Sequence, residues 1–321
     1  MGHHRFTLAT RDNTPINVNK WDVDKNNSPK GIVQISHGMA EWAYRYDSFA
    51  KALNQAGYIV YANDHRGHGL TAPRKEDIGY IPNNDGFACM VEDMAELNGF
   101  IRKEHPHLPI VLFGHSMGSF LSQRFIQLYG SNIHGLILSG SNGKQGPIIN
   151  LGIILAYIEM KIKGRKYRSQ LLNKLTFDSY NRAFAPNRTN FDWLSRDERQ
   201  VDLYIEDPYC GGIFTSSFFY DFLRGLKLIT KKRNLKTIPK DLPIFIFSGS
   251  MDPVGFFGKG IENLVNMYKS IGMTNISYKI YPGGRHEMLN ELNKDEVIED
   301  IITWLNAITK IDMSITCENV T

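Results

Sequence analysis

The sequence PIVLFGHSMGSFLSQRFI at residues 109–126 decides the fold of this chain. An apolar run, a Gly-x-Ser-x-Gly turn centred on Ser116 and a helical pattern follow one another in it. Such a turn places a serine hydroxyl at the tip of a strained loop between a strand and a helix. Gly114 and Gly118 suit this geometry because the chain at both positions passes too close to its neighbours for a Cβ atom. Met117 begins the helix, so we expect its backbone N–H to face an oxyanion beside the serine.

A serine hydroxyl becomes a nucleophile only when a base removes its proton and an acid orients that base. His286 is the one histidine after His134, and it follows the last apolar run in a glycine-rich loop. Asp252 follows the apolar run at residues 243–248 in the same way. The chain order Ser, Asp, His therefore predicts Ser116 as the nucleophile, Asp252 as the orienting acid and His286 as the base.

A second backbone donor is expected in the loop HGMAE at residues 37–41, which follows the apolar run at 32–36. Gly38 permits an unusual turn in this loop, and Met39 would then present its N–H. The sequence thus predicts an oxyanion hole formed by the backbone of Met39 and Met117, with no role for either methionine side chain.

Apolar runs that read as strands alternate with helical patterns along most of the chain, which predicts an α/β fold with a mostly parallel, doubly wound sheet. Residues 5–21 predict an N-terminal hairpin. The alternation stops between residues 142 and 237, where the pattern is helical, and resumes at Leu242. We therefore expect a core of residues 1–141 and 238–321, with a helical cap, residues 142–237, inserted after the sixth strand.

Charge is unevenly placed. Residues 142–237 hold 17 Lys and Arg against 9 Asp and Glu, whereas the rest of the chain holds 20 against 24. This asymmetry fits either an anionic partner, such as a transient contact with an anionic membrane surface, or a solvated basic face. The apolar stretches at 147–158 and 214–223 fit an acyl-chain tunnel or a lipid contact, but for most of these side chains packing of the cap onto the sheet is the preferred interpretation.

The composition points to a protein of the cytoplasm. Residues 1–19 contain no apolar segment of the kind found in secretory signals, and the longest apolar stretch is too short to span a bilayer. The three cysteines, Cys89, Cys210 and Cys317, are far apart and show no CxxC spacing, which fits a reducing compartment.

No cofactor, metal or nucleic acid is expected. The chain lacks a G-x-G-x-x-G after a strand and a phosphate-binding G-x-x-x-x-G-K-[ST] motif. It also lacks a nucleic-acid-binding motif. The run DHRGHG at residues 64–69 holds two histidines and a carboxylate, but not the further ligands that a dinuclear hydrolase needs. We interpret it as a turn held by glycines and polar side chains.

Together these residues resemble the serine α/β-hydrolases of the lysophospholipase and monoacylglycerol lipase group. The resemblance covers nearly the whole chain, and its stretches are HGMAE at 37–41, DHRGHG at 64–69, GHSMG at 114–118, SGSMD at 248–252 and GRH at 284–286, with FDWLSRD at 191–197 and DPYCG at 207–211 similar to cap segments of bacterial members. It implies the triad and oxyanion roles given above. It also implies hydrolysis of a carboxylic ester of a single-chain lipid, a monoacylglycerol or a lysophospholipid, through an acyl-enzyme and without a cofactor.

The resemblance is partial in the pocket for the alcohol half of the substrate. Glu41 and Arg45 match polar positions of that pocket, which implies that they bind substrate. Animal monoacylglycerol lipases carry a second histidine three residues after the catalytic one, and Leu289 stands there in this chain. A small-ester carboxylesterase, a peptidase or C–C bond hydrolase with the same triad, and a non-catalytic binding protein therefore remain alternatives.

Overall fold

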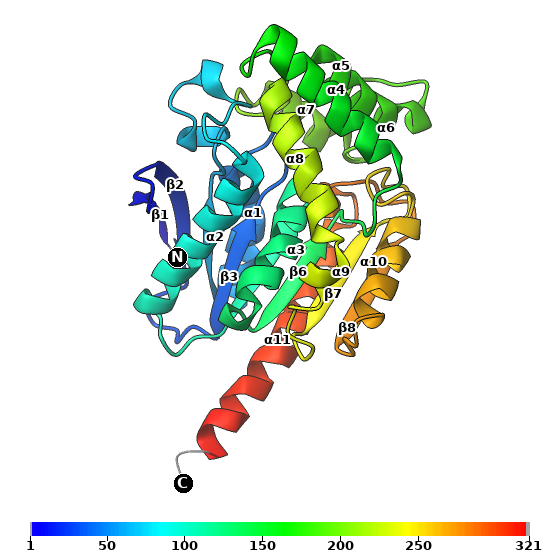
Figure 1. Ribbon diagram of the computed structural model, residues 1–321. Helices are drawn as coiled ribbons and strands as arrows, with labels where there is room; N and C mark the ends of the chain where they lie inside the picture. The colour runs from blue at the N-terminus through cyan, green and yellow to red at the C-terminus, as the bar shows by residue number, and fades with distance from the viewer. Residues whose placement is uncertain (1, 319–321) are drawn as a thin grey trace.

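The computed structural model describes residues 2–318, and the side chains of residues 2–309. Eight strands form one sheet in the order β1-β2-β4-β3-β5-β6-β7-β8 (Figure 1). Strand β2 runs antiparallel to β1 and to β4, and the other neighbouring pairs are parallel. The strands are β1 (Gly2–Ala9), β2 (Pro15–Asp22), β3 (Gly31–Ser36), β4 (Tyr58–Asn63), β5 (Ile110–His115), β6 (Gly135–Ser139), β7 (Ile244–Gly249) and β8 (Ile276–Tyr281). The predicted α/β class, with its N-terminal hairpin, is confirmed.

Helices cover both faces of the sheet, which explains why strands β3 to β7 are apolar runs without alternation: each of their residues is buried. The core on one face contains buried residues of α1 (Asp47–Gln55) and α11 (Lys294–Glu318). The core on the other face contains those of α2 (Gly86–Glu104), α3 (Met117–Tyr129) and α10 (Lys259–Lys269).

The strand order has a switch point at β3. Strand β4 lies on one side of β3 and β5 on the other, so the chain moves in opposite directions from this strand. In such sheets the loops that leave the two neighbouring strands border a crevice at their carboxyl ends. Here Ser36, the last residue of β3, pairs with Gly114 of β5. The fold thereby places the loop 37–41 directly beside the turn that carries Ser116.

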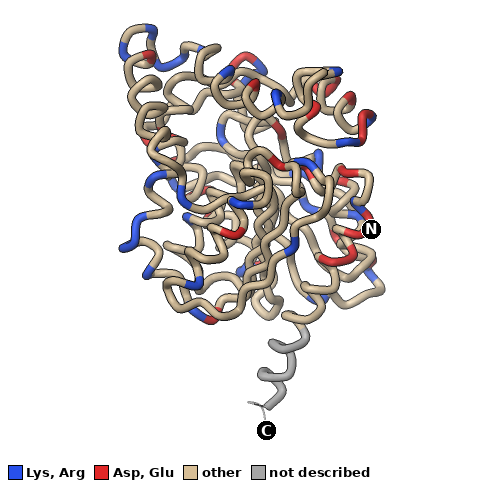
Figure 2. Tube along the Cα trace, turned by 90° about the vertical axis from the view of Figure 1, so that its right-hand side faces the viewer, with Lys and Arg blue, Asp and Glu red and all other residues tan. Residues whose placement is uncertain are grey.

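Six α-helices lie between β6 and β7 in the chain. They are α4 (Ile148–Lys163), α5 (Gln170–Asn173), α6 (Ser179–Asn181), α7 (Glu198–Glu206), α8 (Ser216–Ile229) and α9 (Lys232–Leu235). Those from α4 to α7 and the start of α8 lie above the carboxyl ends of the strands, and α8 then runs down beside the core toward α9 (Figure 1). Figure 2 shows the same upper layer from the side. Buried side chains of α8, among them Phe218 and Phe222, belong to the same apolar core as α2 and α3. The helical insertion after the sixth strand is thus confirmed, whereas the exact cap boundaries, 142 and 237, stay a prediction.

Within residues 2–318 the structure contains no helix with the length and apolar character that a membrane span requires. The two cysteines among the described side chains, Cys89 and Cys210, form no disulfide, and Cys317 lies outside the described side chains.

Candidate active site

Ser116 sits at the tip of the turn between β5 and α3, with φ 51° and ψ −118°. This left-handed backbone is strained for a residue with a side chain. The flanking glycines make the turn possible. A Cβ at Gly118 would lie 2.0 Å from the carbonyl oxygen of Ser36, and one at Gly114 would lie 2.5 Å from Ser122 Oγ. No other residue fits either place, because backbone atoms and packed helix atoms cannot move aside.

His286 and Asp252 form a buried pair at the same end of the sheet. The imidazole Nδ1–H donates to Asp252 Oδ1 over 2.9 Å, and His286 and Asp252 are 1% and 0% exposed. Asp252 is held in turn by the backbone N–H of Val254, 2.9 Å from Oδ1, and by the hydroxyl of Ser248 on Oδ2. The carboxylate therefore fixes the tautomer that leaves Nε2 as the proton acceptor.

Burial and charge act in opposite directions on this pair. Burial by itself would lower the pKa of His286, but the negative charge of Asp252 and the hydrogen bond between them outweigh it and raise the pKa above its usual value. For Asp252, burial would raise the pKa, and His286 and the other donors hold it below its usual value. The pair thus favours an ionised aspartate beside a histidine that accepts a proton readily.

The His286 ring lies against the turn that carries Ser116. Its centroid is 4.7 Å from that of His115, the residue before the serine, and 4.9 Å from that of Trp193 in the cap. A Cβ at Gly140, the residue after β6, would lie 2.7 Å from His286 Cε1, so this position admits only glycine. The hydrogen bonds of the described residues do not include one between Ser116 Oγ and His286 Nε2. Catalytic hydrogen bonds in ligand-free enzymes are commonly long and tighten with substrate.

The loop 37–41 lies over the serine. A Cβ at Gly38 would be 3.3 Å from Ser116 Cβ, and the next residues turn sharply because Ala40 has φ 59°. Among the described residues, neither the Met39 N–H nor the Met117 N–H donates a hydrogen bond outside regular helices and strands. Met117 is the first residue of α3, where a helix leaves its N–H groups without intrahelical partners. Both residues belong to the loop and the turn that meet at Ser116, and their role as oxyanion donors stays a prediction.

Glu41 and Arg45 occupy a buried network behind this loop. Glu41 accepts the Gly38 N–H on Oε1 and the Arg45 guanidinium, 2.8 Å away, on Oε2. Arg45 also binds Glu287 with two hydrogen bonds of 2.7 and 2.8 Å. Burial would raise the pKa of Glu287, but Arg45 lowers it to about 2. Leu289 borders the same network, at a cavity of only about 30 Å³.

Glu287 is a residue that the sequence reasoning missed. It follows His286 directly, and its carboxylate joins the loop that carries the base to Arg45 and hence to the oxyanion loop. A signal was present, since a carboxylate adjacent to the predicted base in a buried loop needs a cation, and Arg45 had no predicted partner. The substrate-binding roles predicted for Glu41 and Arg45 stay predictions, because the described contacts of both side chains are with the protein itself.

An apolar cavity of about 300 Å³ lies between the core and the cap, next to the loop of Met39. At one end it is bordered by Met39 of the oxyanion loop and by Val254, two residues after Asp252. At the other it reaches Ile148, Leu151 and Leu175, which are exposed. Side chains of α4, α5 and α8 form its walls. A mostly apolar cleft of this size is typical of a site for a small organic ligand.

The run DHRGHG forms a buried turn. Asp64 accepts the backbone N–H groups of Ala43 and Leu70, each at 2.8 Å. Gly69 has φ 47°, and a Cβ there would lie 2.5 Å from the Asp64 carboxylate. His65 donates its backbone N–H to the ring of His37. Across residues 2–309, no three His, Cys, Asp or Glu side chains gather as ligands for a metal.

Comparison with known proteins shows what the whole chain is similar to. A family model described as "Serine aminopeptidase, S33" matches residues 27–293. The monoacylglycerol lipase of Mycolicibacterium smegmatis is 27% identical over 288 residues, which cover 89% of this chain and 90% of the lipase. The monoglyceride lipase of Rattus norvegicus is 27% identical over 282 residues, 87% of this chain and 83% of the lipase. A carboxyl esterase of Bacillus coagulans, solved with glycerol, superposes with a TM-score of 0.88 at 28% identity, over 96% of this chain and 99% of the esterase.

Proposed function

The chain belongs to the hydrolase family described as serine aminopeptidase, S33, and we propose that it cleaves carboxylic esters of single-chain lipids, monoacylglycerols or lysophospholipids, through an acyl-enzyme. One observation carries the proposal: the buried His286–Asp252 pair lies against the turn of Ser116. An apolar cavity bordered by Met39 of the oxyanion loop and by Val254, two residues after Asp252, lies close to it. The relatives named as monoacylglycerol lipases support the same reading.

In the first half of the proposed reaction, Ser116 Oγ attacks the ester carbonyl carbon while His286 Nε2 takes the hydroxyl proton. The carbonyl oxygen becomes an oxyanion, and the N–H groups of Met39 and Met117 donate to it. Each such donor contributes roughly 2.7–4 kcal/mol to transition-state stabilisation. The ester C–O bond then breaks, and His286 returns the proton to the leaving alcohol.

In the second half, His286 removes a proton from water as the water oxygen attacks the acyl-Ser116 carbonyl. The same oxyanion donors act again, the Ser116 C–O bond breaks, and Ser116 recovers a proton from His286. The fatty acid leaves and the site is regenerated. Asp252 keeps Nδ1 protonated throughout and stabilises the imidazolium that forms in each half.

Glu41, Arg45 and Glu287 border the small cavity of about 30 Å³ beside His115, which has room for about one water molecule. The single positive charge of Arg45 is paired with two carboxylates, so we assign this network mainly to holding the loops of Met39 and His286 in place. Leu289, at the position where animal monoacylglycerol lipases carry a histidine, borders the same cavity.

The experiment that tests the proposal is hydrolysis of p-nitrophenyl esters from acetate to palmitate by the wild type and by Ser116→Ala. We expect a maximum in kcat/KM at medium or long acyl chains, and its loss in Ser116→Ala. Activity confined to acetate and butyrate would replace the proposal with a small-ester carboxylesterase. Absence of turnover on every ester would overturn it in favour of a peptidase, a C–C bond hydrolase or a binding protein.

A cavity-narrowing variant tests whether the apolar cavity holds the acyl chain. Leu175 lines the cavity at its exposed end, so Leu175→Trp is expected to shift the maximum to shorter esters and to leave acetate hydrolysis unchanged. Leu203 is similarly exposed, 49% against 54% for Leu175, but lies on α7 away from the cavity. An equal shift in Leu203→Trp, or no shift in Leu175→Trp, would place the acyl chain elsewhere.

A further inference from the structure

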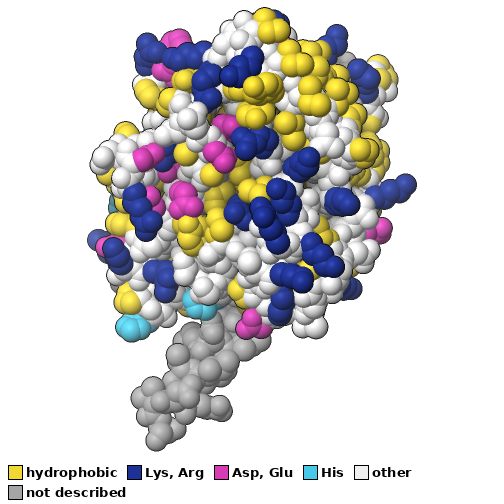
Figure 3. Space-filling view, viewed as in Figure 1, with side chains coloured by type: hydrophobic (Ala, Val, Ile, Leu, Met, Phe, Trp, Pro, Cys, Tyr) yellow, Lys and Arg dark blue, Asp and Glu magenta, His cyan; other side chains and the backbone are white. Residues whose placement is uncertain are grey.

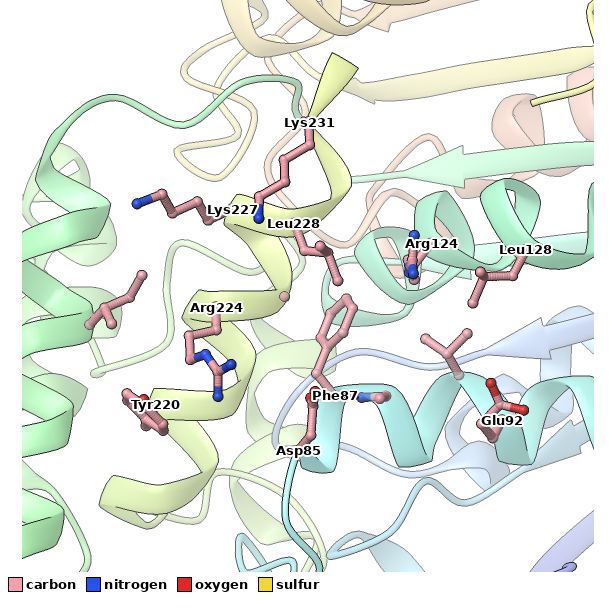
Figure 4. A pocket seen from close by; sticks show the side chains of 14 residues that line it. Asp85, Phe87, Glu92, Arg124, Leu128, Tyr220, Arg224, Lys227, Leu228 and Lys231 are labelled. Carbon is pink, nitrogen blue, oxygen red and sulfur yellow. Dashed lines mark hydrogen bonds between the residues drawn. The ribbon is translucent and has the colours of Figure 1, made fainter. Parts of the chain in front are cut away.

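The cap meets the core on two sides that differ in character. On the side of α8, a groove of about 610 Å³ lies between this helix and helices α2 and α3 (Figure 4). Charged side chains line it, among them Glu92, Arg124 and Arg224. Figure 3 shows Lys and Arg side chains spread over this face. The residues of the groove belong to helices or their ends, so they give the loops of Met39 and His286 no direct support.

On the other side, cap residues 193–211 contact both catalytic loops. At one end of this segment the backbone N–H of His286 donates to the Trp193 carbonyl over 3.3 Å. Arg196 donates its backbone N–H and its Nε–H to the fully buried carboxylate of Glu291, over 3.0 and 2.9 Å. Both contacts join the cap to the loop that carries the base, so the place of His286 depends on this part of the cap.

At its other end the same segment holds the oxyanion loop, residues 37–41, by one carbonyl. The Ala40 oxygen accepts the hydroxyl of Tyr204 on α7 at 2.9 Å and the backbone N–H of Gly211 at 3.0 Å. Ala40 is buried and has φ 59°, a conformation that residues with a side chain rarely adopt. Two donors on one buried carbonyl stabilise this conformation, because a turn of the backbone would leave all three polar groups without partners.

Met39 lies between two peptide groups that are each held. Its own N–H belongs to the peptide group of Gly38, whose carbonyl accepts the Nδ1–H of His37 over 2.8 Å. The C=O and N–H of a trans peptide point in opposite directions, so this bond turns the Met39 N–H away from His37. The cap holds the carbonyl of Ala40 through Tyr204. The direction of the Met39 N–H therefore depends on one bond within the core and one bond to the cap.

The surroundings of Tyr204 keep its hydroxyl in place as a donor. The side chain is buried, and its ring lies 5.1 Å from the Phe191 ring and 4.8 Å from the Arg45 guanidinium. Burial raises the pKa of the Tyr204 hydroxyl well above its usual value, so the group keeps its proton at neutral pH. The packed ring has little freedom to move, and the hydroxyl stays on the Ala40 carbonyl.

We propose that Tyr204 is a positioning residue for the oxyanion hole, and that cap residues 193–211 set the place of this hole relative to His286. The Tyr204 hydroxyl fixes the Ala40 carbonyl and thereby the Met39 N–H, and it touches no reacting atom. The inference rests on the proposed function, since the oxyanion forms only during acyl transfer. It also divides the cap by role: residues 193–211 support the chemistry, whereas α4, α5 and α8 form the walls of the apolar cavity.

The variant Tyr204→Phe tests the inference because it removes the hydroxyl and keeps the ring. With p-nitrophenyl butyrate we expect kcat to fall roughly tenfold at little change in KM, less than the about 10²–10³-fold loss caused by removing a whole oxyanion donor. The matched control is Tyr58→Phe. Tyr58 is also buried, and its hydroxyl lies 3.1 Å from Asn306 Oδ1 and from Thr309 Oγ1, at the amino end of β4. This control should keep the kcat of the wild type.

Inhibition separates positioning from a general loss of structure. Decyl trifluoromethyl ketone adds to Ser116: the Oγ–C bond forms, the hydroxyl proton passes to His286 and the carbonyl oxygen becomes an oxyanion. Decanol fills an apolar site without forming an oxyanion. In Tyr204→Phe the Ki of the ketone should rise roughly tenfold, in step with the fall of kcat/KM, because both report binding of the oxyanion. The Ki of decanol should stay that of the wild type.

A second variant acts on the same loop through a different bond. Trp42, the residue after the oxyanion loop, donates its Nε1–H to Asp207 Oδ2 of the cap at 2.8 Å. Trp42→Phe removes this donor and should again raise the Ki of the ketone in step with the fall of kcat/KM. It also decides the matter if circular dichroism and thermal unfolding show that Tyr204→Phe does not fold.

The outcomes separate this inference from the proposed function. Wild-type kcat and ketone Ki in Tyr204→Phe, equal losses in Tyr204→Phe and Tyr58→Phe, or a raised KM at unchanged kcat would each overturn the positioning role and leave ester hydrolysis intact. A wild type that turns over no ester would instead remove the proposed function, and the inference with it.

Discussion

The properties of the site depend on a few buried side chains, and Asp252 is the most constrained of them. Its carboxylate is fully buried and accepts from His286, Ser248 and Val254. A buried carboxylate with this many donors stays ionised and cannot turn away. It therefore both orients the His286 ring and raises the pKa of the ring, and both effects can be measured.

When kcat/KM for a soluble ester is measured against pH, it should fall toward acidic pH along an acidic limb, and the midpoint of this limb should lie above pH 6.5, the usual pKa of histidine. The sign follows from the mechanism, since only neutral His286 accepts a proton and the pKa of His286 is raised. In Asp252→Asn the limb should move to lower pH, and kcat should fall by about 10⁴-fold because the tautomer is lost. A wild-type limb at or below 6.5, or an unmoved limb in the variant, would contradict this assignment.

The same shift has a consequence for stability. Because the folded protein raises the pKa of His286, folding favours its protonated form. This contribution to the free energy of unfolding is fully present below pH 6.5, and it is lost as the pH rises through the raised pKa of His286. Denaturant unfolding at several pH values should show the loss in the wild type and not in His286→Gln. Parallel curves for both proteins would mean that another group is responsible.

Glu287→Gln tests the network that joins the two loops. The amide cannot neutralise Arg45, which keeps only Glu41, so the free energy of unfolding should fall by about 3 kcal/mol, the lower end for breaking a buried pair. We expect kcat to fall more than KM rises, since the change acts on the positions of His286 and Met39. Urea unfolding and steady-state kinetics measure the two effects.

The control for this prediction is a surface pair. Glu296 pairs with Lys279 at 2.8 Å in an exposed place, so Glu296→Gln should leave both kcat and stability close to those of the wild type. An unchanged kcat in Glu287→Gln, or the same response in both variants, would show that the network does not position the catalytic loops.

At the scale of elements, the packing of the cap onto the core depends on α8. A Cβ at Gly225 would lie 2.3 Å from the Phe87 ring, so α8 approaches α2 closely only because this position has no side chain. Gly225→Ala should lower the free energy of unfolding by about 1–3 kcal/mol. Gly99 within α2 has nothing within 4 Å of its Cβ position, so Gly99→Ala should raise it by about 0.5–1 kcal/mol. Urea unfolding separates the two, and equal changes would refute the close packing.

Elements with a strong periodic signal were predictable, and short ones were not. The apolar runs of β3 to β7 follow from burial of these strands on both faces of the sheet. The helical pattern at α3 follows from burial of one face of the helix. For the cap the sequence predicted only a helical pattern without element bounds, and in the structure the segment 170–184 holds α5, α6 and a five-residue π-helical turn at Lys174–Asp178. Its conformation depends on packing against the rest of the cap, which no local pattern encodes.

At the scale of the whole molecule, the sequence predicts those features of the site that follow from the order of the strands and of the residues along the chain. Each predicted triad or oxyanion residue follows a strand, and parallel strands end at one edge of the sheet, so their convergence could be expected. Arg45 and Glu287 form an ion pair although they are 242 residues apart in the chain. The open end of the cavity is formed by α4 and the segment after α5. Such contacts depend on tertiary packing, so only the structure reveals them.

The measurement that tests the central claim most directly is the intact mass of the wild type, quenched in acid during turnover of p-nitrophenyl decanoate, followed by peptide mapping. The account predicts a decanoyl group on the peptide that contains Ser116, at the serine itself, and no adduct in Ser116→Ala. Turnover without an adduct on Ser116, or an adduct on another residue that persists in Ser116→Ala, would contradict an acyl-enzyme at this serine.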